Sequence, residues 1–194
     1  MADIRLIVGL GNPGPRYATT RHNVGVQFVQ ELATRYGIGF VDATKFKGAV
    51  GRGTIAGVDL RLLIPDTYMN LSGESVGPFA HFYKIAPAEV IVAYDEVAFE
   101  PGVVRLKSGG GANGHNGIKS VAEGLGSKDF HRLRIGVGHP GDKELMTSYL
   151  TSVTMPAVER ELAEAAWRLD DDVVDSLVHG QIRAAMNGLH KPQE

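Results

Sequence analysis

Six short polar segments interrupt the apolar stretches of this 194-residue chain. Each begins or ends an expected strand or helix and carries Asn, His, Asp, Arg or Gly, the residue types that position substrates and move protons. One such segment is weak evidence, whereas six in one chain indicate a site assembled from several loops. In chain order they read GLGNPG (9–14), TRHN (20–23), YMNLSGESVG (68–77), AYDE (93–96), GGGANGHNGIK (109–119) and FHRLRIGVGHPG (130–141).

The elements that must hold these segments alternate between strand and helix. Residues 4–8 and 90–93 are continuous apolar runs, typical of strands buried on both faces. Apolar residues at helical spacing predict a helix over 24–36 that ends at Gly37. Further strands are predicted at 46–55, 58–64, 103–106 and 133–137, the first two joined as a hairpin at Gly57, and further helices at 76–83, 116–125 and 155–178, the last interrupted near Asp170. The pattern indicates an α/β fold in a single domain, residues 1–194.

Composition limits the classes of protein that fit. Hydrophobic residues make up 43% of the chain and charged residues 22%, as in ordinary globular proteins. There is no cysteine, which excludes disulfides, thiolate metal sites and a cysteine nucleophile. No apolar run is long enough for a secretory signal or a membrane span, so we expect a soluble protein.

Charge is small overall, at −2, but unevenly distributed. Residues 105–143 contain seven Lys or Arg and three acids, while residues 155–178 contain seven acids and two arginines. A charged segment is usually a solvated face. Here the basic one runs through glycine-rich loops, which favours contact with phosphate.

Two common motifs occur, and each has a simpler explanation. Gly9, Gly11 and Gly14 match the dinucleotide pattern G-x-G-x-x-G, but no acidic residue follows at the spacing of a ribose contact, which argues against a nucleotide cofactor. Residues 73–77 match the nucleophile elbow G-x-S-x-G, but no strand leads directly into Ser75. We interpret Ser72 and Ser75 as helix caps.

Taken together, the six segments resemble the bacterial peptidyl-tRNA hydrolase family in order and spacing from residue 4 to about 142, and more loosely beyond. The resemblance implies a single compact domain with a twisted mixed sheet between helices, acting as a monomer in the cytoplasm without metal or cofactor. It implies hydrolysis of the ester between the peptide and the 3′-terminal ribose of peptidyl-tRNA, which recycles the tRNA.

The residues are suited to that chemistry. An aminoacyl ester is already activated, so a positioned water, one base and a few amide dipoles suffice. His22 is the expected general base, because imidazole titrates near neutrality. Asp95, at the end of a buried strand, would orient His22 and stabilise its charged form. The simpler role of either residue is capping.

Three loop asparagines would position the substrate and the water. Asn12 and Asn116 are expected to lie nearest the ester, where their uncharged amides would polarise its carbonyl. Asn70 is expected to hold the peptide. Tyr17 and Met69 would line the peptide side, or belong to the core. His115 is a further candidate substrate contact, or it orients its loop.

Basic residues are expected to contact the tRNA. The resemblance implies a clamp for the phosphate at the 5′ end of the acceptor stem, formed by Arg105, Lys107 and Arg134. A terminal phosphate carries extra charge, so binding it would identify tRNA without contacts to bases. Arg134 could instead form a surface ion pair.

The chain departs from the family pattern in three places. Ala112 and Asn113 stand where the family commonly has His-Gly, residues 97–100 lack a usual acid and proline, and residues 148–155 lack an expected glycine. These changes bear on loop flexibility and substrate gating. Two other functions stay open, a catalytically silent relative that binds tRNA or RNA, and a serine esterase acting through Ser75.

Overall fold

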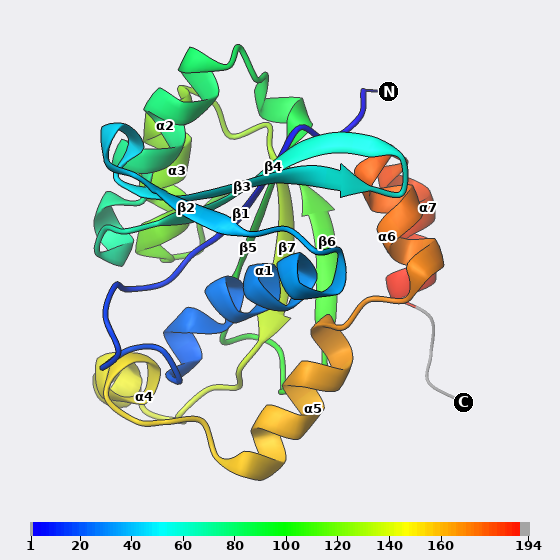
Figure 1. The fold of residues 1–194 in the computed structure, drawn as a ribbon. Helices are drawn as coiled ribbons and strands as arrows, with labels where there is room; N and C mark the ends of the chain where they lie inside the picture. The colour runs from blue at the N-terminus through cyan, green and yellow to red at the C-terminus, as the bar shows by residue number, and fades with distance from the viewer. Residues whose placement is uncertain (1, 191–194) are drawn as a thin grey trace.

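Seven strands form one mixed sheet in the computed structural model, which describes residues 2–190 (Figure 1). The strand order is β2-β3-β4-β1-β5-β7-β6. The four central strands β4, β1, β5 and β7 run parallel, and the outer pairs are antiparallel. The strands are β1 (Leu6–Gly9), β2 (Phe40–Ala43), β3 (Gly48–Ile55), β4 (Val58–Pro65), β5 (Val90–Glu96), β6 (Val104–Ser108) and β7 (His131–Gly136).

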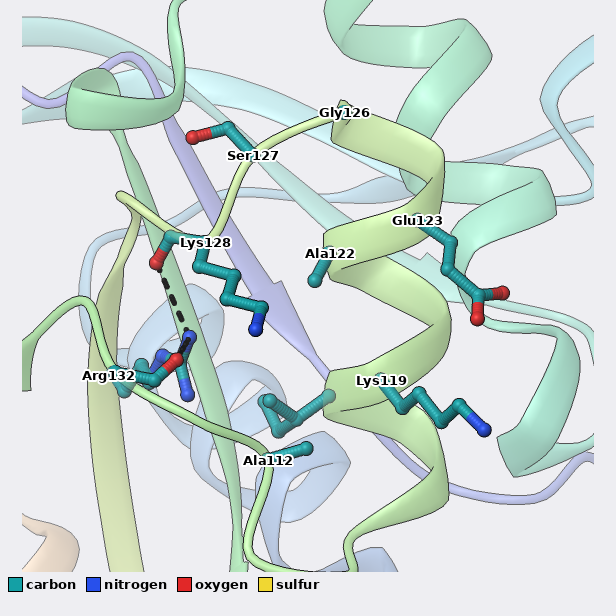
Figure 2. A pocket seen from close by; sticks show the side chains of 10 residues that line it. Ala112, Lys119, Ala122, Glu123, Gly126, Ser127, Lys128 and Arg132 are labelled. Carbon is teal, nitrogen blue, oxygen red and sulfur yellow. Dashed lines mark hydrogen bonds between the residues drawn. The ribbon is translucent and has the colours of Figure 1, made fainter.

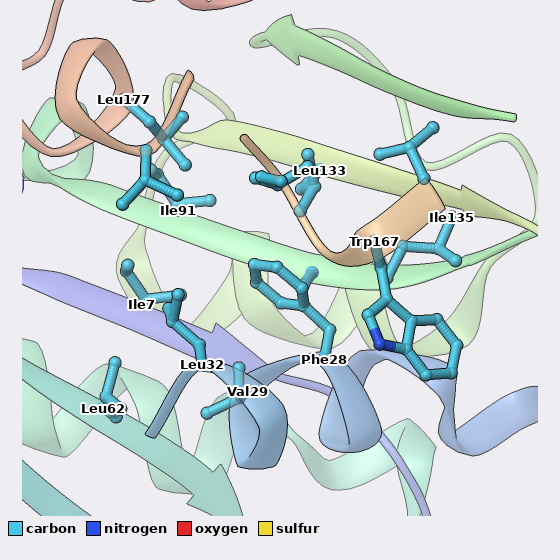
Figure 3. Close-up of a cluster of buried hydrophobic side chains, with 14 of the residues drawn as sticks. Ile7, Phe28, Val29, Leu32, Leu62, Ile91, Leu133, Ile135, Trp167 and Leu177 are labelled. Carbon is cyan, nitrogen blue, oxygen red and sulfur yellow. The ribbon is translucent and has the colours of Figure 1, made fainter. Parts of the chain in front are cut away.

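Helices cover both faces of this sheet. One buried apolar cluster joins α1, α5, α6 and α7 to one face, with Phe28, Trp167 and Leu177 packed over Ile7 and Leu133 (Figure 3). A second cluster joins α2 and α3 to the other face. The helices are α1 (Val24–Arg35), α2 (Gly73–Phe82), α3 (Asn116–Leu125), α4 (Met146–Thr151), α5 (Ala157–Trp167), α6 (Asp171–Val178) and α7 (Ile182–Leu189). Within residues 2–190, no helix has the length and apolar character needed to cross a bilayer.

The predicted α/β class and the mixed sheet between helices are confirmed. The hairpin turns at Gly57, whose φ of 81° suits glycine. The predicted helix over 155–178 is two helices, α5 and α6, separated near Asp170 as expected. The strand predicted from residue 46 begins at Gly48, because Phe46 closes a 3-10 turn and Lys47 has a left-handed backbone.

The G-x-S-x-G segment serves helix packing. Gly73 and Gly77 lie against α3, and a Cβ at Gly77 would stand 2.5 Å from the carbonyl oxygen of Gly124. The interpretation of Ser72 and Ser75 as side-chain caps is wrong. Ser72 occupies the position before α2, but its hydroxyl donates to the carbonyl of Met69, and Ser75 is fully buried in the first turn.

One of the two edges of the sheet, strand β6, is covered by α7. The backbone N–H of Leu106 on this strand donates to Nε2 of His190, just after α7, at 3.0 Å. A side chain therefore supplies the hydrogen bond that a neighbouring strand would otherwise provide.

Candidate active site

Three side chains from different elements meet at the carboxyl end of β5. His22 lies in a 3-10 turn (Arg21–Asn23) that leads into α1, Asp95 lies on β5, and His115 immediately precedes α3. Nδ1 of His22 is 2.6 Å from Oδ2 of Asp95, and Nε2 of His115 is 2.7 Å from Oδ1. Asp95 is 2% exposed. The carboxylate is thus buried between two imidazole rings.

The hydrogen bonds assign the protons of both rings. Nδ1 of His115 accepts the backbone N–H of Ile118 at 3.2 Å, so its Nε2 carries the proton that is donated to Asp95. Burial raises the pKa of Asp95, but the charges and hydrogen bonds of the two histidines outweigh it and hold that pKa far below its usual range. Asp95 is therefore an ionised acceptor, and His22 donates to it through Nδ1. This leaves Nε2 of neutral His22 free to accept a proton.

The electrostatics make His22 a stronger base than a free imidazole. Burial lowers the pKa of His22, but attraction to Asp95 and the hydrogen bond to it raise the pKa above 6.5 on balance. The shift has the direction expected for a histidine backed by a carboxylate.

Asn12 is held by a set of hydrogen bonds beside this cluster. The side chain of Asn23 accepts from the backbone N–H of Asn12 and donates to its carbonyl, both at 2.9 Å. Oδ1 of Asn12 accepts the backbone N–H of Met69 at 2.8 Å. With its oxygen engaged, the side chain keeps its NH2 group available for a substrate oxygen. Asn23 is buried and adjoins His22. It was not predicted as a site residue from the sequence, although it is the last residue of the TRHN segment.

The remaining candidates for substrate contact are spread over three segments. Asn70 is exposed after β4, and Asn116 is exposed at the first position of α3. Tyr17 is half-buried and stacks edge to face on Tyr68, whose ring centroid lies 6.5 Å away. Met69 is only 4% exposed and belongs to the core, so its backbone N–H, rather than its thioether, contacts Asn12.

The three predicted tRNA contacts share one face at the β6 edge of the sheet. Arg105 lies opposite Arg134 in the antiparallel pair β6–β7, and Lys107 lies opposite Arg132. Residues opposite one another, or two apart on a strand, point to the same face. The pKa of Lys107 is lowered by burial and by the neighbouring charges of Arg134 and Arg132. Four cations therefore lie together.

Arg134 has a carboxylate neighbour. Its guanidinium is 3.8 Å from Glu96 and stacks over the ring of Phe99, with 4.9 Å from Cζ to the ring centroid. Both charged side chains are largely buried, which differs from the surface ion pair considered from the sequence. The charge of Arg134 is partly offset, and that of Lys107 has no carboxylate within ion-pair distance among residues 2–190.

The segment after β7 is tied to the turn that carries His22. Arg21 is buried, stacks on the ring of Tyr149 in α4 at 3.8 Å, and binds Glu159 of α5 at 2.7 Å. The hydroxyl of Tyr149 donates to the carbonyl of Val137 at 2.6 Å. The departure from the family pattern at 148–155 thus begins in α4, which is anchored beside the site, and continues into the segment that follows this helix.

His22, Asp95 and His115 are also ligand types for a metal, and their ligand atoms lie within 4.8 Å of one another. Both carboxylate oxygens, however, lie at hydrogen-bonding distance from ring nitrogens, and both of these nitrogens carry the protons assigned above. The geometry is that of a hydrogen-bonded cluster centred on the carboxylate. The expectation that the reaction needs no metal or cofactor stays a prediction.

Comparison with known proteins identifies the family. Residues 6–194 match the family model described as peptidyl-tRNA hydrolase. The peptidyl-tRNA hydrolase of Acinetobacter baumannii strain AYE is 50% identical over 190 residues, covering 98% of this chain and 97% of the relative, and that of Shewanella frigidimarina is 49% identical over 193 residues with the same coverage. A crystal structure of peptidyl-tRNA hydrolase from Acinetobacter baumannii superimposes with a TM-score of 0.95 at 49% identity, covering 100% of this chain and 97% of that one. The chain belongs to the peptidyl-tRNA hydrolase family.

Proposed function

We propose that this peptidyl-tRNA hydrolase uses His22 as the general base that activates water. Nε2 of His22 takes a proton from water while the water oxygen attacks the ester carbonyl carbon. The bond between that carbon and the ribose oxygen then breaks, and His22 returns the proton to the ribose oxygen. The products are a peptide with a free carboxyl group and a tRNA with a free 3′-terminal ribose hydroxyl.

The observation that carries this proposal is the bond from His22 Nδ1 to the buried Asp95, at 2.6 Å. It fixes the ring with Nε2 free and stabilises the imidazolium that forms during proton transfer. His115 donates to the other oxygen of Asp95 and thereby holds the carboxylate in place. In this proposal His115 is a positioning residue rather than a substrate contact.

The asparagines are proposed to act on the substrate directly. The free NH2 group of Asn12 is suited to stabilise the developing negative charge on the ester carbonyl oxygen, together with Asn116. Asn70 is assigned to the peptide backbone, with Tyr17 and the backbone of Met69 beside it. Amide groups and a tyrosine ring contact peptides of any sequence, as a substrate of variable sequence requires.

The cationic face is proposed to bind the acceptor stem of the tRNA. Lys107 and Arg134 are assigned to the 5′-terminal phosphate, with Arg105 beside them. We propose that one chain acts alone in the cytoplasm, where peptidyl-tRNA is formed, without metal or cofactor.

The test is release of free tRNA from an N-acetylated aminoacyl-tRNA, with an unblocked aminoacyl-tRNA as control. The native chain is expected to hydrolyse only the blocked ester, and His22→Ala is expected to lose about 10²- to 10⁴-fold in kcat. A native chain that binds the tRNA without turnover would instead be a silent RNA-binding relative. Turnover unaffected by His22→Ala would remove His22 as the base.

A further inference from the structure

Arg132 on β7 is the largest of the fully buried side chains, with 0% of its surface exposed. Within residues 2–190 it forms no ion pair. Burying an unpaired cation is costly, so its contacts need an explanation. The guanidinium donates to the backbone carbonyls of Gly110 and Gly111, each at 2.6 Å. It also donates to the carbonyl of Lys128 at 3.1 Å (Figure 2). It also stacks over the ring of Phe130, 4.5 Å from Cζ to the centroid.

Two of these carbonyls belong to the glycine-rich loop that joins β6 to α3. Gly109, Gly110, Asn113 and Gly114 all have positive φ angles, between 50° and 99°. The backbone of this loop is therefore left-handed at four positions. Because most of the loop residues are glycine, side-chain packing does little to fix its conformation. Its conformation must therefore be fixed from outside.

The loop also borders a cavity. The cavity has a volume of about 410 Å³ and lies between the loop, α3 and the turn after α3, with Ala112, Ile118 and Ala122 on its apolar wall (Figure 2). Space behind the loop would allow it to shift. Arg132 lines this cavity too, and its hydrogen bonds to Gly110 and Gly111 hold the loop against β7.

The loop ends at residues of the active site. His115 donates to Asp95, and Asn116 begins α3. Arg132 lies on β7, which pairs in parallel with β5, the strand that carries Asp95, and it is directly opposite Val92. Arg132 therefore ties the start of the loop to the two strands that hold the carboxylate, while His115 ties its end.

We propose that Arg132 is a positioning residue for the 109–116 loop and, through that loop, for His115 and Asn116. This inference rests on the proposed function for its kinetic consequences, but its structural consequence is independent of it. A lysine keeps the charge and reaches one carbonyl, whereas the planar guanidinium reaches three. The charge alone is therefore insufficient.

The experiment compares Arg132→Lys and Arg132→Met with the native chain, and uses Arg52→Lys as a matched control. Arg52 is an exposed residue of the β3–β4 hairpin paired with Asp59. Both Arg132 variants are expected to lose roughly 100-fold in kcat, since a misplacement of about 1 Å has that effect, with KM changed less than about threefold. Amides 109–118 should exchange hydrogen faster in Arg132→Lys, while those of β1 and β5 remain protected. If Arg132→Met does not fold, the kcat and hydrogen-exchange measurements on Arg132→Lys alone decide the test.

Two further readouts separate positioning from other roles. Arg132→Lys should lose as much activity on a blocked aminoacyl ester of adenosine, which has no 5′-terminal tRNA phosphate, as on the full tRNA. Arg132→Lys should also move the acid limb of the pH–rate profile to higher pH, because Asp95, once released from His115, holds the proton of His22 more tightly. Adding His115→Asn to Arg132→Lys should move the acid limb no further.

Several results would overturn the proposal. Native kcat with native exchange in Arg132→Lys would show that the loop needs no such support. A loss confined to 5′-phosphorylated tRNA would assign Arg132 to phosphate binding, and faster exchange throughout the chain would assign it to overall stability. If the native chain hydrolyses no ester, the proposed function fails, and the exchange measurement still decides the role of Arg132.

Discussion

His22 and His115 bind opposite oxygens of a single buried carboxylate, with their ring centroids 5.3 Å apart. The two rings therefore compete for the negative charge of Asp95. One ring keeps a free nitrogen for catalysis, and the other has its second nitrogen engaged by the first turn of α3. In our proposals, the same carboxylate therefore serves both proton transfer and placement of the 109–116 loop.

Asp95→Asn tests the electrostatic role of the carboxylate. An amide has one accepting oxygen and no charge, so it cannot satisfy both rings. We expect kcat to fall about 10²- to 10⁴-fold. The acid limb of the pH–rate profile should also move to lower pH, because it is the attraction to Asp95 that raises the pKa of His22 above 6.5. An unchanged acid limb would show that another group controls the profile.

The stability of the fold should depend on pH in a defined window. A raised pKa for His22 contributes stability that is complete below about 6.5 and is lost as the pH rises through the folded-state pKa. A lowered pKa for Asp95 contributes stability above about 3.9 that is lost as the pH falls. Urea denaturation should show the largest contribution of this cluster between about pH 4 and 6.5. In Asp95→Asn the falls in stability below about pH 4 and above about pH 6.5 should both be smaller, and a curve parallel to that of the native chain would contradict the linkage.

His115 has two separable roles, tested by two substitutions. His115→Ala removes both the bond to Asp95 and the cap on Ile118 N–H, while an asparagine can still cap the helix. Both should lose about tenfold in kcat, the equivalent of one hydrogen bond of about 1.4 kcal/mol. Only His115→Ala should also lose about 1 kcal/mol of stability. Equal stability of the two variants would show that the cap contributes nothing.

Lys107→Ala and Arg134→Ala test the phosphate clamp. Each removes a charge-assisted hydrogen bond, so KM for 5′-phosphorylated tRNA should rise about 10-fold or more while kcat changes little. Neither should raise KM further for tRNA whose 5′ phosphate has been removed. Glu96→Gln should change KM in the opposite direction. It removes the carboxylate that pairs with the guanidinium of Arg134, so KM for 5′-phosphorylated tRNA should fall. Equal losses on both tRNAs would place these residues elsewhere on the substrate.

Ser75→Ala should leave hydrolysis unchanged. Ser75 is fully buried in α2, and its hydroxyl has no hydrogen-bond partner in the described part of the chain. Fluorophosphonate labelling of the native chain should therefore be absent. Labelling that disappears in Ser75→Ala, together with lost turnover, would restore the serine esterase alternative.

Much of the fold was predictable because hydrophobic periodicity is a local signal. The buried runs around Ile7 and Ile91 mark β1 and β5, and the helical spacing after His22 marks α1. The short strand β2 was missed because its residues are largely exposed and carry no such pattern. Helices α4 and α7 were not predicted from their residues either.

The partnerships within the site depend on contacts that sequence spacing does not specify. Asp95 and His22 could be nominated by residue type, but the bond from Asp95 to His115 requires β5 and the start of α3 to meet. The two hydrogen bonds between the side chain of Asn23 and the backbone of Asn12 require the turn before α1 to fold back on the first loop. In the sequence Arg132 is one more basic residue in a strand, and its burial depends on contacts with the glycine loop, Lys128 and Phe130 that only the fold creates.

The bond from Leu106 to His190 also affects how copies of the molecule meet. An outermost strand with free backbone groups is a template for pairing with the same strand of another copy, which leads to aggregation. Here a helix and an imidazole cover that edge. Because the ring must stay neutral to accept, and its pKa is lowered by burial and by Arg105 and Arg134, the covering persists at neutral pH. The cations that we assign to the tRNA thus also favour the neutral form of the ring that occupies the backbone N–H of this edge strand.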